Sequence, residues 1–280
     1  VVKDDGLAAG KGVVVTSVAS AALDHARACL AAGGTVVVEE FLDGPEVSLF
    51  GVTDGTTVVP LVPAQDFKRI GDNDEGPNTG GMGAYSPLPW APKTLVADVV
   101  RDVLQPTVDE MARRGTPFAG LLYAGLALTS SGTRVIEFNA RFGDPETQVV
   151  LARLESPLGD LLLAAATGTL ALLPGLQWTT DSAITVVIAA ANYPDAPETG
   201  AIIHGLDAVT DAQVFHAGTA QRGKDIVVSG GRVLSVTATG SDLKAARCKA
   251  YDAVAKVEFA GAQFRTDIAL AASLGKVSVP

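Results

Sequence analysis

The strongest sign of chemistry lies in residues 134–146, which run Arg-Val-Ile-Glu-Phe-Asn-Ala-Arg-Phe-Gly-Asp-Pro-Glu. The first part of this run predicts a strand, and residues two apart in a strand share a face. Glu137 and Asn139 therefore present two oxygen donors together, whereas Ile136 and Phe138 point into the core. Hard oxygen donors suit Mg²⁺, which usually completes its shell with water and phosphate oxygens. The pattern predicts a magnesium site, with a polar edge strand as the alternative.

The residues that follow this pair extend the candidate site. Arg141 continues the same face, and its planar guanidinium can bind a phosphate or carboxylate through two parallel hydrogen bonds. Asp144-Pro145-Glu146 supplies an N-cap, a proline at the first helical position and an acidic first turn. We therefore expect a helix that begins there and runs to about Leu154.

A glycine-rich segment at residues 3–12 is the second candidate. It reads Lys-Asp-Asp-Gly-Leu-Ala-Ala-Gly-Lys-Gly, and such loops let backbone N–H groups approach phosphates. The spacing does not match a P-loop, because three residues instead of four lie between Gly6 and Gly10, and Gly12 replaces the hydroxyl residue. A phosphate-binding loop of another kind and an ordinary hairpin both remain open.

Two further segments carry clustered polar residues. Glu39 and Glu40 end a Val-rich run and Glu46 follows, although a solvated strand edge explains this pattern more simply. Residues 63–92 have little periodicity and predict a long loop, and loops of this length are usually functional. In this loop, residues 65–69 and 76–85 offer charged side chains and exposed N–H groups for a phosphorylated ligand. A mobile surface loop is the alternative.

The elements that must position these residues alternate between short β-branched runs and helical patterns. Strands are expected at 13–15, 36–41, 47–52, 57–62, 121–128 and 134–138, and helices at 17–30, 92–113, 144–154 and 157–167. After Asp181 the composition changes and predicts a small α+β domain. Its expected strands lie at 183–190, 213–216, 226–228 and 232–239, with a helix at 242–257 and a hairpin turn at Gly230-Gly231. The fold class is α/β (α+β).

The composition argues against two classes of protein, nucleic-acid binders and membrane-spanning proteins. The chain has 280 residues, of which 48% are hydrophobic, and 21 Lys+Arg stand against 31 Asp+Glu. A net charge of −10 argues against a nucleic-acid partner, which calls for a basic face. Mean hydropathy is +0.30, yet apolar runs such as 184–191 fall well short of the roughly 18 residues that a membrane span needs. Cys29 and Cys248 make neither a disulfide framework nor a zinc site, so we expect core-filling thiols in a reducing compartment.

Taken together, these segments closely resemble the phosphoribosylamine–glycine ligase (glycinamide ribonucleotide synthetase) family of ATP-grasp enzymes. The resemblance runs in order from residue 1 to about residue 270. Its longest parts are the segments at 3–12, 39–44, 65–69, 76–87, 122–126, 137–148, 214–219 and 230–238. The pair Glu137 and Asn139 alone would indicate only the wider ATP-grasp group.

The resemblance implies an activity in purine biosynthesis: ATP-dependent ligation of glycine to 5-phosphoribosylamine through glycyl phosphate, giving glycinamide ribonucleotide, ADP and phosphate. It implies an ATP-grasp fold, with residues 1–50 as part of the lid, 51–180 as the core that holds the metal and substrate sites, and 181–280 as a C-terminal α+β domain. The family's N-terminal α/β domain has no counterpart here, so we expect the biological chain to extend further. Another ATP-grasp carboxylate–amine ligase and a truncated nucleotide-binding module without turnover are the alternatives.

The resemblance also implies a role for each site residue. The residues expected to bind ATP are Lys3, Gly10, Lys11 and Gly12 at the phosphates, Glu39, Glu40, Phe41 and Leu42 beside the adenine, and Glu46 at the ribose. Those expected to hold Mg²⁺ (or Mn²⁺) are Glu137 and Asn139. The catalytic pair is Arg141, which stabilises the transferring phosphoryl group, and Asp144, which lies near the substrate amine with Glu146. Those expected to contact the phosphoribosyl substrate are Asp66, Lys68, Arg69, Asn78, Thr79, Gly80, Gly81 and Met82. We expect a cytoplasmic monomer with small-molecule substrates and no membrane or nucleic-acid partner.

Overall fold

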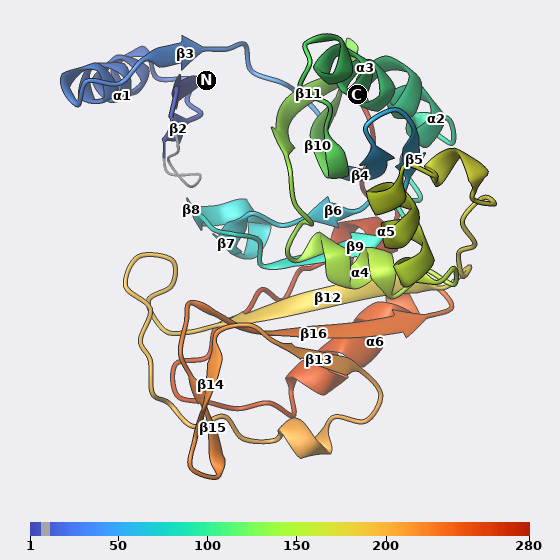
Figure 1. The fold of residues 1–280 in the computed structure, drawn as a ribbon. Coiled ribbons are helices and arrows are strands. Elements are labelled where there is room, and N and C mark those ends of the chain that lie inside the picture. Colours follow the sequence, from blue (N-terminus) through green and yellow to red (C-terminus); the bar gives the residue numbers. More distant parts are fainter. Residues whose placement is uncertain (7–11) are drawn as a thin grey trace.

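The computed structural model describes residues 1–6 and 12–280, which form a small lid and a larger body (Figure 1). The lid consists of an antiparallel sheet in the order β2-β1-β3 and one helix. Its elements are β1 (Val2–Asp4), β2 (Val13–Val14), β3 (Val36–Val38) and α1 (Ala19–Ala31). Valine runs favour the strands and an alanine-rich stretch favours the helix. Gly10 and Lys11, two of the predicted ATP-binding residues, lie outside the described residues.

An extended connection, residues 39–45, joins the lid to the body. The strand expected to reach Phe41 ends at Val38, and the Phe41 side chain is 71% exposed. Helix α1 buries Cys29, whereas Leu23 and Leu30 face solvent. The lid therefore contributes little to the core of the protein.

A four-stranded antiparallel sheet forms the centre of the body, in the order β11-β10-β4-β5. Its strands are β4 (Glu46–Asp54), β5 (Val58–Pro60), β10 (Ala119–Thr129) and β11 (Gly132–Asn139). Helices cover both faces, so β4 and β10 are buried almost throughout and read as continuous apolar runs. Leu49 and Leu122 pack toward the helices of residues 95–113, and Phe50 and Leu121 pack toward those of residues 146–167.

The helix expected at 92–113 is interrupted. It consists of α2 (Leu95–Val99), a π-helical segment η2 (Val100–Leu104) and α3 (Gln105–Arg113). Pro106 has no N–H to donate to the preceding turn, and its ring crowds that turn. The wider π geometry just before it accommodates this loss.

The helix expected at 144–154 is shorter than predicted at both ends. Helix α4 spans Glu146–Leu151, its N-cap is Pro145, and no side chain caps it. The expected N-cap, Asp144, instead accepts a hydrogen bond at Oδ1 from Gln148 Nε2 at 2.8 Å. Helix α5 (Leu158–Thr167) matches its predicted range closely and ends at Gly168, whose left-handed conformation (φ +72°) stops the helix.

A five-stranded antiparallel sheet in the order β13-β16-β12-β9-β6 underlies the body. Its strands are β6 (Gln65–Asp66), β9 (Gly83–Ser86), β12 (Ser182–Ala189), β13 (Gln213–His216) and β16 (Arg232–Gly240). Helix α6 (Leu243–Val254) packs on it, capped by the Asp242 side chain, which accepts from Ala245 N at 2.7 Å. The sheet joins strands from both sides of residue 181, so the last hundred residues share a core with the loop region.

The region 63–92 was expected to lack regular structure, and this expectation is wrong. Besides β6 and β9, it forms the β7 (Arg69–Gly71) and β8 (Glu75–Asn78) pair around a short helix η1 (Asp72–Asp74). Strand β9 pairs with β12, whose residues lie about a hundred positions later. Such distant pairing leaves no periodic signal in a short strand.

The remaining C-terminal elements contain two further corrections. Strands β14 (Thr219–Arg222) and β15 (Asp225–Val228) form a hairpin, so Gly230-Gly231 links β15 to β16 instead of turning a hairpin between them. Cys29 is buried as expected, but Cys248 is exposed. Short helices lie at η3 (Leu170–Leu172), η4 (Leu206–Ala208) and α7 (Leu270–Ser273). Across the described ranges, no helix combines the length and apolar character needed to cross a bilayer.

Candidate active site

The polar residues of the central sheet gather on one face, and strand register explains why. Tyr123 lies opposite Asn139 on one side and Phe50 on the other, and Gly125 lies opposite Glu137 and Ser48. Directly opposed residues point to the same face of a sheet. This face, called the site face, carries Glu46, Ser48, Tyr123, Gly125, Glu137 and Asn139.

Glu137 and Asn139 lie side by side on the site face, as the strand pattern predicts. Asn139 Nδ2 donates to Glu137 Oε1 at 3.2 Å. A side chain at Gly125 would come within 3.2 Å of Glu137 Cγ, so glycine leaves room for the carboxylate. Within the described residues, no cluster of three or more His, Cys, Asp or Glu side chains is arranged to hold a metal ion. Any metal at this pair would therefore also use oxygens from water or phosphate.

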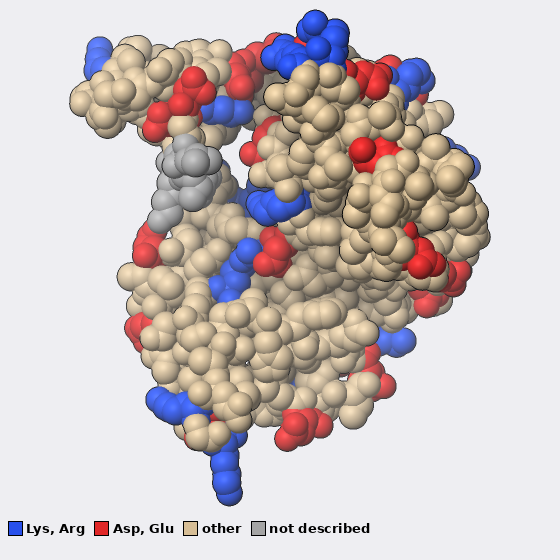
Figure 2. All heavy atoms as spheres, in the orientation of Figure 1, with Lys and Arg blue, Asp and Glu red and all other residues tan. Residues whose placement is uncertain are grey.

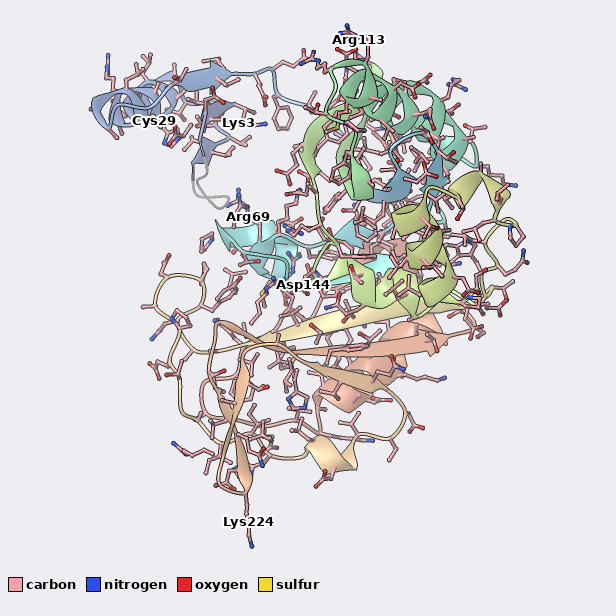
Figure 3. All side chains as sticks on the ribbon, viewed as in Figure 1. Lys3, Cys29, Arg69, Arg113, Asp144 and Lys224 are labelled. Atoms are coloured by element: carbon pink, nitrogen blue, oxygen red, sulfur yellow. The ribbon has the colours of Figure 1, made fainter. Side chains whose placement is uncertain are left out.

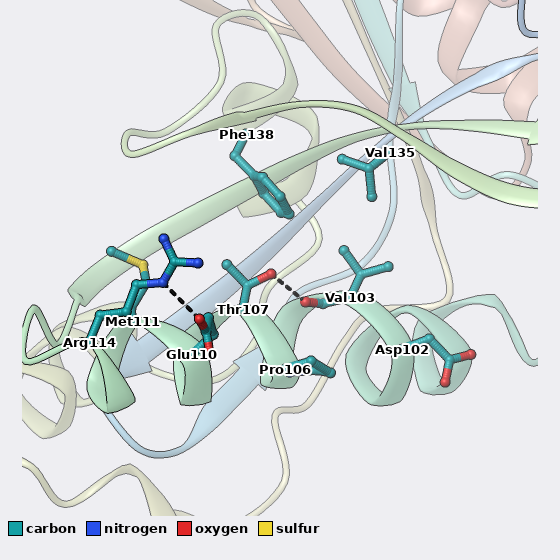
Figure 4. Close-up of a pocket in the computed structure, with 9 residues that line it drawn as sticks. All are labelled: Asp102, Val103, Pro106, Thr107, Glu110, Met111, Arg114, Val135 and Phe138. Carbon is teal, nitrogen blue, oxygen red and sulfur yellow. Dashed lines mark hydrogen bonds and ion pairs between the residues drawn. The ribbon is translucent and has the colours of Figure 1, made fainter. Parts of the chain in front are cut away.

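The opposite face of β11 differs from the prediction. The register shifts between Gly125 and Leu126, so Ile136 has no partner on β10. Val135 and Phe138 consequently share a face and lie over α3, where they line a hollow of about 490 Å³ (Figure 4). Ile136 is half-buried and Phe138 is 42% exposed, so the expectation that both point into the core is wrong.

Glu146 is the buried carboxylate of the site. Its side chain comes from the first turn of α4 and is 3% exposed. Tyr123 OH donates to its Oε1 at 2.5 Å and Ser48 Oγ donates to the same atom at 3.0 Å. Burial and the negative charges of Glu146 and Asp66 raise the pKa of the Tyr123 phenol, which keeps it a donor. A side chain at Gly143 would collide with Glu146 Oε2 at 2.6 Å, so the carboxylate needs glycine there.

Three charged residues cluster beside Glu146. Lys68 Nζ pairs with Glu46 Oε2, and Asp66 lies on β6 nearby. Burial raises the pKa of Asp66 to about 7, opposed by the charge of Lys68 and reinforced by Glu146 and Glu46. Burial alone would lower the pKa of Lys68, but the carboxylates of Asp66 and Glu46 hold it above its ordinary value. The cluster can therefore present one fixed positive charge and one carboxyl group that titrates near neutrality.

The glycine turn at residues 79–81 packs tightly between the body and the C-terminal strands. Gly81 has φ +109°, and a side chain there would approach Pro145 Cδ to 2.4 Å. Thr79 Oγ1 donates to Lys68 O at 2.8 Å and accepts from Gly81 N at 3.0 Å. These bonds tie the turn to Lys68, which lies in the link between β6 and β7.

Met82 was predicted to contact the substrate, and the structure places it elsewhere. Its side chain is 0% exposed. Its backbone is also occupied, because Met82 N donates to Phe67 O and its carbonyl accepts from Val187 N. Met82 therefore belongs to the core under the turn, and this part of the prediction is wrong.

The lid brings Lys3 toward the site from across an open space. Figure 3 shows Lys3 on the lid side, with Arg69 and Asp144 on the body side. Lys3 Nζ lies 2.5 Å from Glu39 Oε2, so these two predicted ATP-binding residues form an ion pair. In the space-filling view, positive and negative side chains meet in the hollowed centre of this face, below the lid (Figure 2).

The other predicted residues lie around the rim of this region. Arg69 Nη1 donates to Gly76 O at 2.7 Å, within the β7–β8 pair that also carries Asn78. Arg141 is exposed and donates to the carbonyl of its neighbour Phe142 at 2.9 Å. Gly12 accepts from Asp4 N in the lid sheet. The roles assigned to these residues stay predictions.

Sequence reasoning missed three residues that shape the site. Ser48 and Tyr123 anchor Glu146, and Arg232 reaches the glycine turn from the start of β16. Tyr123 and Arg232 lie inside segments quoted for the family resemblance, so the resemblance was a usable signal. Ser48 lies in a run of apolar residues, where nothing local marks it as functional.

Solved structures share this architecture. A phosphoribosylamine–glycine ligase from Thermotoga maritima is 34% identical, with a TM-score of 0.85 over 95% of this chain and 68% of that one. The biotin carboxylase domain of the Hydrogenobacter thermophilus 2-oxoglutarate carboxylase is 14% identical, with a TM-score of 0.61 over 88% of this chain and 52% of that one. The second likeness shows a shared fold alone. Together with the ATP-grasp domain that residues 1–147 match, the lid, the sheets and the site face define an ATP-grasp protein.

Sequence profiles and relatives narrow this class. Residues 1–147 match the phosphoribosylglycinamide synthetase ATP-grasp (A) domain and residues 183–271 match the C domain of the same family. The chain belongs to the phosphoribosylglycinamide synthetase family. Its relatives include phosphoribosylamine–glycine ligases from Streptomyces coelicolor (67% identical over 98% of this chain) and Mycobacterium leprae (55% identical over 100% of this chain). The chain spans 66% of the length of each of these relatives.

Proposed function

We propose that the full-length protein uses ATP to join glycine to 5-phosphoribosylamine, forming glycinamide ribonucleotide, ADP and phosphate. The observation that carries this proposal is the 67% identity, over 98% of the chain, to a phosphoribosylamine–glycine ligase. Support also comes from the site face, which brings the predicted metal residues Glu137 and Asn139 onto the same face as Glu46, the ion-pair partner of Lys68. Among the residues that the structure describes, no feature of the site favours a different ATP-grasp ligase or a module without turnover.

In the proposed reaction, an oxygen of the glycine carboxylate attacks the γ-phosphorus of ATP and forms glycyl phosphate and ADP. The amine of phosphoribosylamine then attacks the carbonyl carbon, a C–N bond forms, phosphate leaves and the amine loses a proton. A carboxylate resists acylation until its oxygen becomes part of a phosphate leaving group. Phosphoryl transfer itself needs mainly positioning and positive charge, which Lys3, Lys68 and Arg141 can supply.

Two carboxylates beside the acceptor region suit the proton that the amine releases. Glu146 is buried and fixed by two hydroxyl donors, which orients one oxygen and leaves Oε2 on the side of Gly143. Asp144 lies at the edge of the hollowed region, where its carboxylate is half exposed. We assign the position of the substrate amine to the space near these two residues.

The donor set at Glu137 and Asn139 fits a divalent cation. A carboxylate and an amide oxygen share one face, and the amide that now donates to Glu137 can present its oxygen by rotating. Mg²⁺ or Mn²⁺ bound there would neutralise charge on the nucleotide phosphates. Glu137 also lies close enough to Lys68 to help hold its pKa above the ordinary value, so metal and acceptor regions adjoin.

The decisive experiment replaces Glu137 with glutamine in the full-length protein and uses Glu155→Gln, on the exposed surface of the body, as the matched control. We expect Glu137→Gln to weaken Mg²⁺-dependent ATP binding and to lower kcat in an ADP-release assay that requires both glycine and freshly made phosphoribosylamine. Glu155→Gln should behave as wild type.

Two results would count against this proposal. If ADP release by the wild type does not depend on glycine and phosphoribosylamine, the proposed ligase activity is contradicted. Full activity of Glu137→Gln at low Mg²⁺ would contradict the assignment of Glu137 as a metal ligand. The cytoplasmic location, the monomeric state and the lack of a nucleic-acid partner stay predictions from composition and family resemblance.

A further inference from the structure

Arg232 connects the C-terminal strands to the candidate active site. It begins β16, and its side chain is 23% exposed. Its Nη1 donates to Gly80 O at 2.8 Å and to Asp144 O at 2.6 Å, with Gly81 O at 3.4 Å. Its Nη2 lies 3.1 Å from Asp144 Oδ2. One guanidinium therefore holds two segments, the glycine turn and the loop before α4, that the sequence separates by more than sixty residues.

The glycine turn is shaped around this guanidinium. A side chain at Gly80 would come within 2.8 Å of Arg232 Cζ, so the turn and the arginine are in close contact. On the other side, Gly80 N donates to Tyr193 OH at 2.9 Å. The Tyr193 ring in turn needs glycine at position 231, where a side chain would approach Tyr193 Cδ2 to 2.3 Å. The turn is thus held from two sides by the C-terminal part of the chain.

The same contacts orient the Asp144 carboxylate. Arg232 binds its Oδ2, and Gln148 Nε2 donates to its Oδ1 at 2.8 Å. With both oxygens engaged, the carboxylate plane has little freedom to rotate. A planar guanidinium with several donors in a rigid fork can hold a carboxylate and nearby carbonyls at once, whereas a lysine ammonium offers a single charged point.

We propose that Arg232 is a positioning residue for the acceptor half of the site. It fixes the Gly80–Gly81 turn against Asp144, so that the phosphoribosylamine amine meets the activated glycine in a reactive geometry. This inference rests on the proposed function. It also assigns the C-terminal strands a part in the reaction.

The test compares Arg232→Met and Arg232→Lys with Arg222→Met in the full-length protein. Arg222 lies on exposed β14 and serves as the matched control. For Arg232→Met we expect kcat/KM for phosphoribosylamine to fall between about ten- and a hundredfold, because a small misplacement of reacting groups has effects of this order. The KM for ATP and the calorimetric affinity for ATP should stay within about twofold, since the bonds of Arg232 among the described residues reach none assigned to the nucleotide. Arg232→Lys should recover part of the loss and Arg222→Met should match wild type.

Several outcomes would overturn the inference. An equally large loss of calorimetric affinity for ATP would indicate general disruption of the fold. Unchanged acceptor kinetics in a folded Arg232→Met would show that the contacts do not matter for the reaction. If Arg232→Met does not fold, Arg232→Lys carries the same comparison. If the wild type shows no ligase activity, the proposed function fails independently of this inference. Amide hydrogen exchange of residues 78–83 then tests whether Arg232 holds the turn. Unchanged exchange in Arg232→Met would refute that role for Arg232.

Discussion

The buried carboxylate of Glu146 gives the most direct test of how the site is built. Tyr123→Phe removes one hydroxyl and leaves the ring in place. The phenol donates to Glu146 Oε1 at 2.5 Å, and Ser48 Oγ donates to the same oxygen at 3.0 Å. The change therefore deletes one of two donors to a charged, buried oxygen without opening a cavity of any size.

The expected cost follows from the nature of that bond. A hydrogen bond to a charged group contributes about 1.5–3 kcal/mol, against about 0.5–1.5 kcal/mol for a neutral one. Because Glu146 is 3% exposed, water cannot easily replace the lost donor. We therefore expect Tyr123→Phe to lower the free energy of unfolding by about 1.5–3 kcal/mol. Tyr251→Phe, whose hydroxyl partners are the neutral backbone groups of Arg265 and Ile268, should cost about 0.5–1.5 kcal/mol.

Urea unfolding of the single variants and of Tyr123→Phe/Ser48→Ala measures these costs. Because Ser48 Oγ and the Tyr123 phenol lie 2.7 Å apart and both contact Glu146 Oε1, the cost of the double change should differ from the sum of the single costs by about 0.5 kcal/mol or more. A loss below about 0.5 kcal/mol for Tyr123→Phe, the range of ordinary surface changes, would refute the idea that the phenol anchors the carboxylate. Strict additivity in the cycle would show that the two hydroxyls do not share one acceptor.

Two further changes test the turn and the charged cluster. Gly81→Ala should destabilise the protein by about 1–3 kcal/mol or more, because φ is +109° and the new methyl group would collide with Pro145. The control is Gly159→Ala in the first turn of α5, where a side chain would meet no other atom. In thermal unfolding this control should be neutral or slightly stabilising. The pKa of Asp66 is about 3.8 in the unfolded chain and about 7 in the folded protein. Between these pH values the native state binds one more proton than the unfolded state. The free energy of unfolding of the wild type should therefore fall as the pH rises from about 4 to about 7. Asp66→Asn should flatten this pH dependence, and an identical slope in both proteins would contradict the raised pKa.

The sequence alone determined the local part of the site. Glu137 and Asn139 share a face because a strand alternates with a period of two, and no distant contact is needed to see this. The positions of β4, β10 and α5 follow in the same way from long apolar runs and a glycine stop. The wider assignment of roles came from the family resemblance, which supplies contacts that local pattern cannot.

Only the tertiary structure decided how these pieces meet. The register shift leaves Ile136 without a partner on β10, and strand β9 forms because β12 lies beside it. Arg232 reaches a turn 152 positions earlier, and Glu146 finds its donors on two different strands. Each of these features depends on partners far away in the chain. Local propensity and periodicity record only neighbours within a few residues, so contacts at this separation have no local signature and appear only once the sheets are assembled.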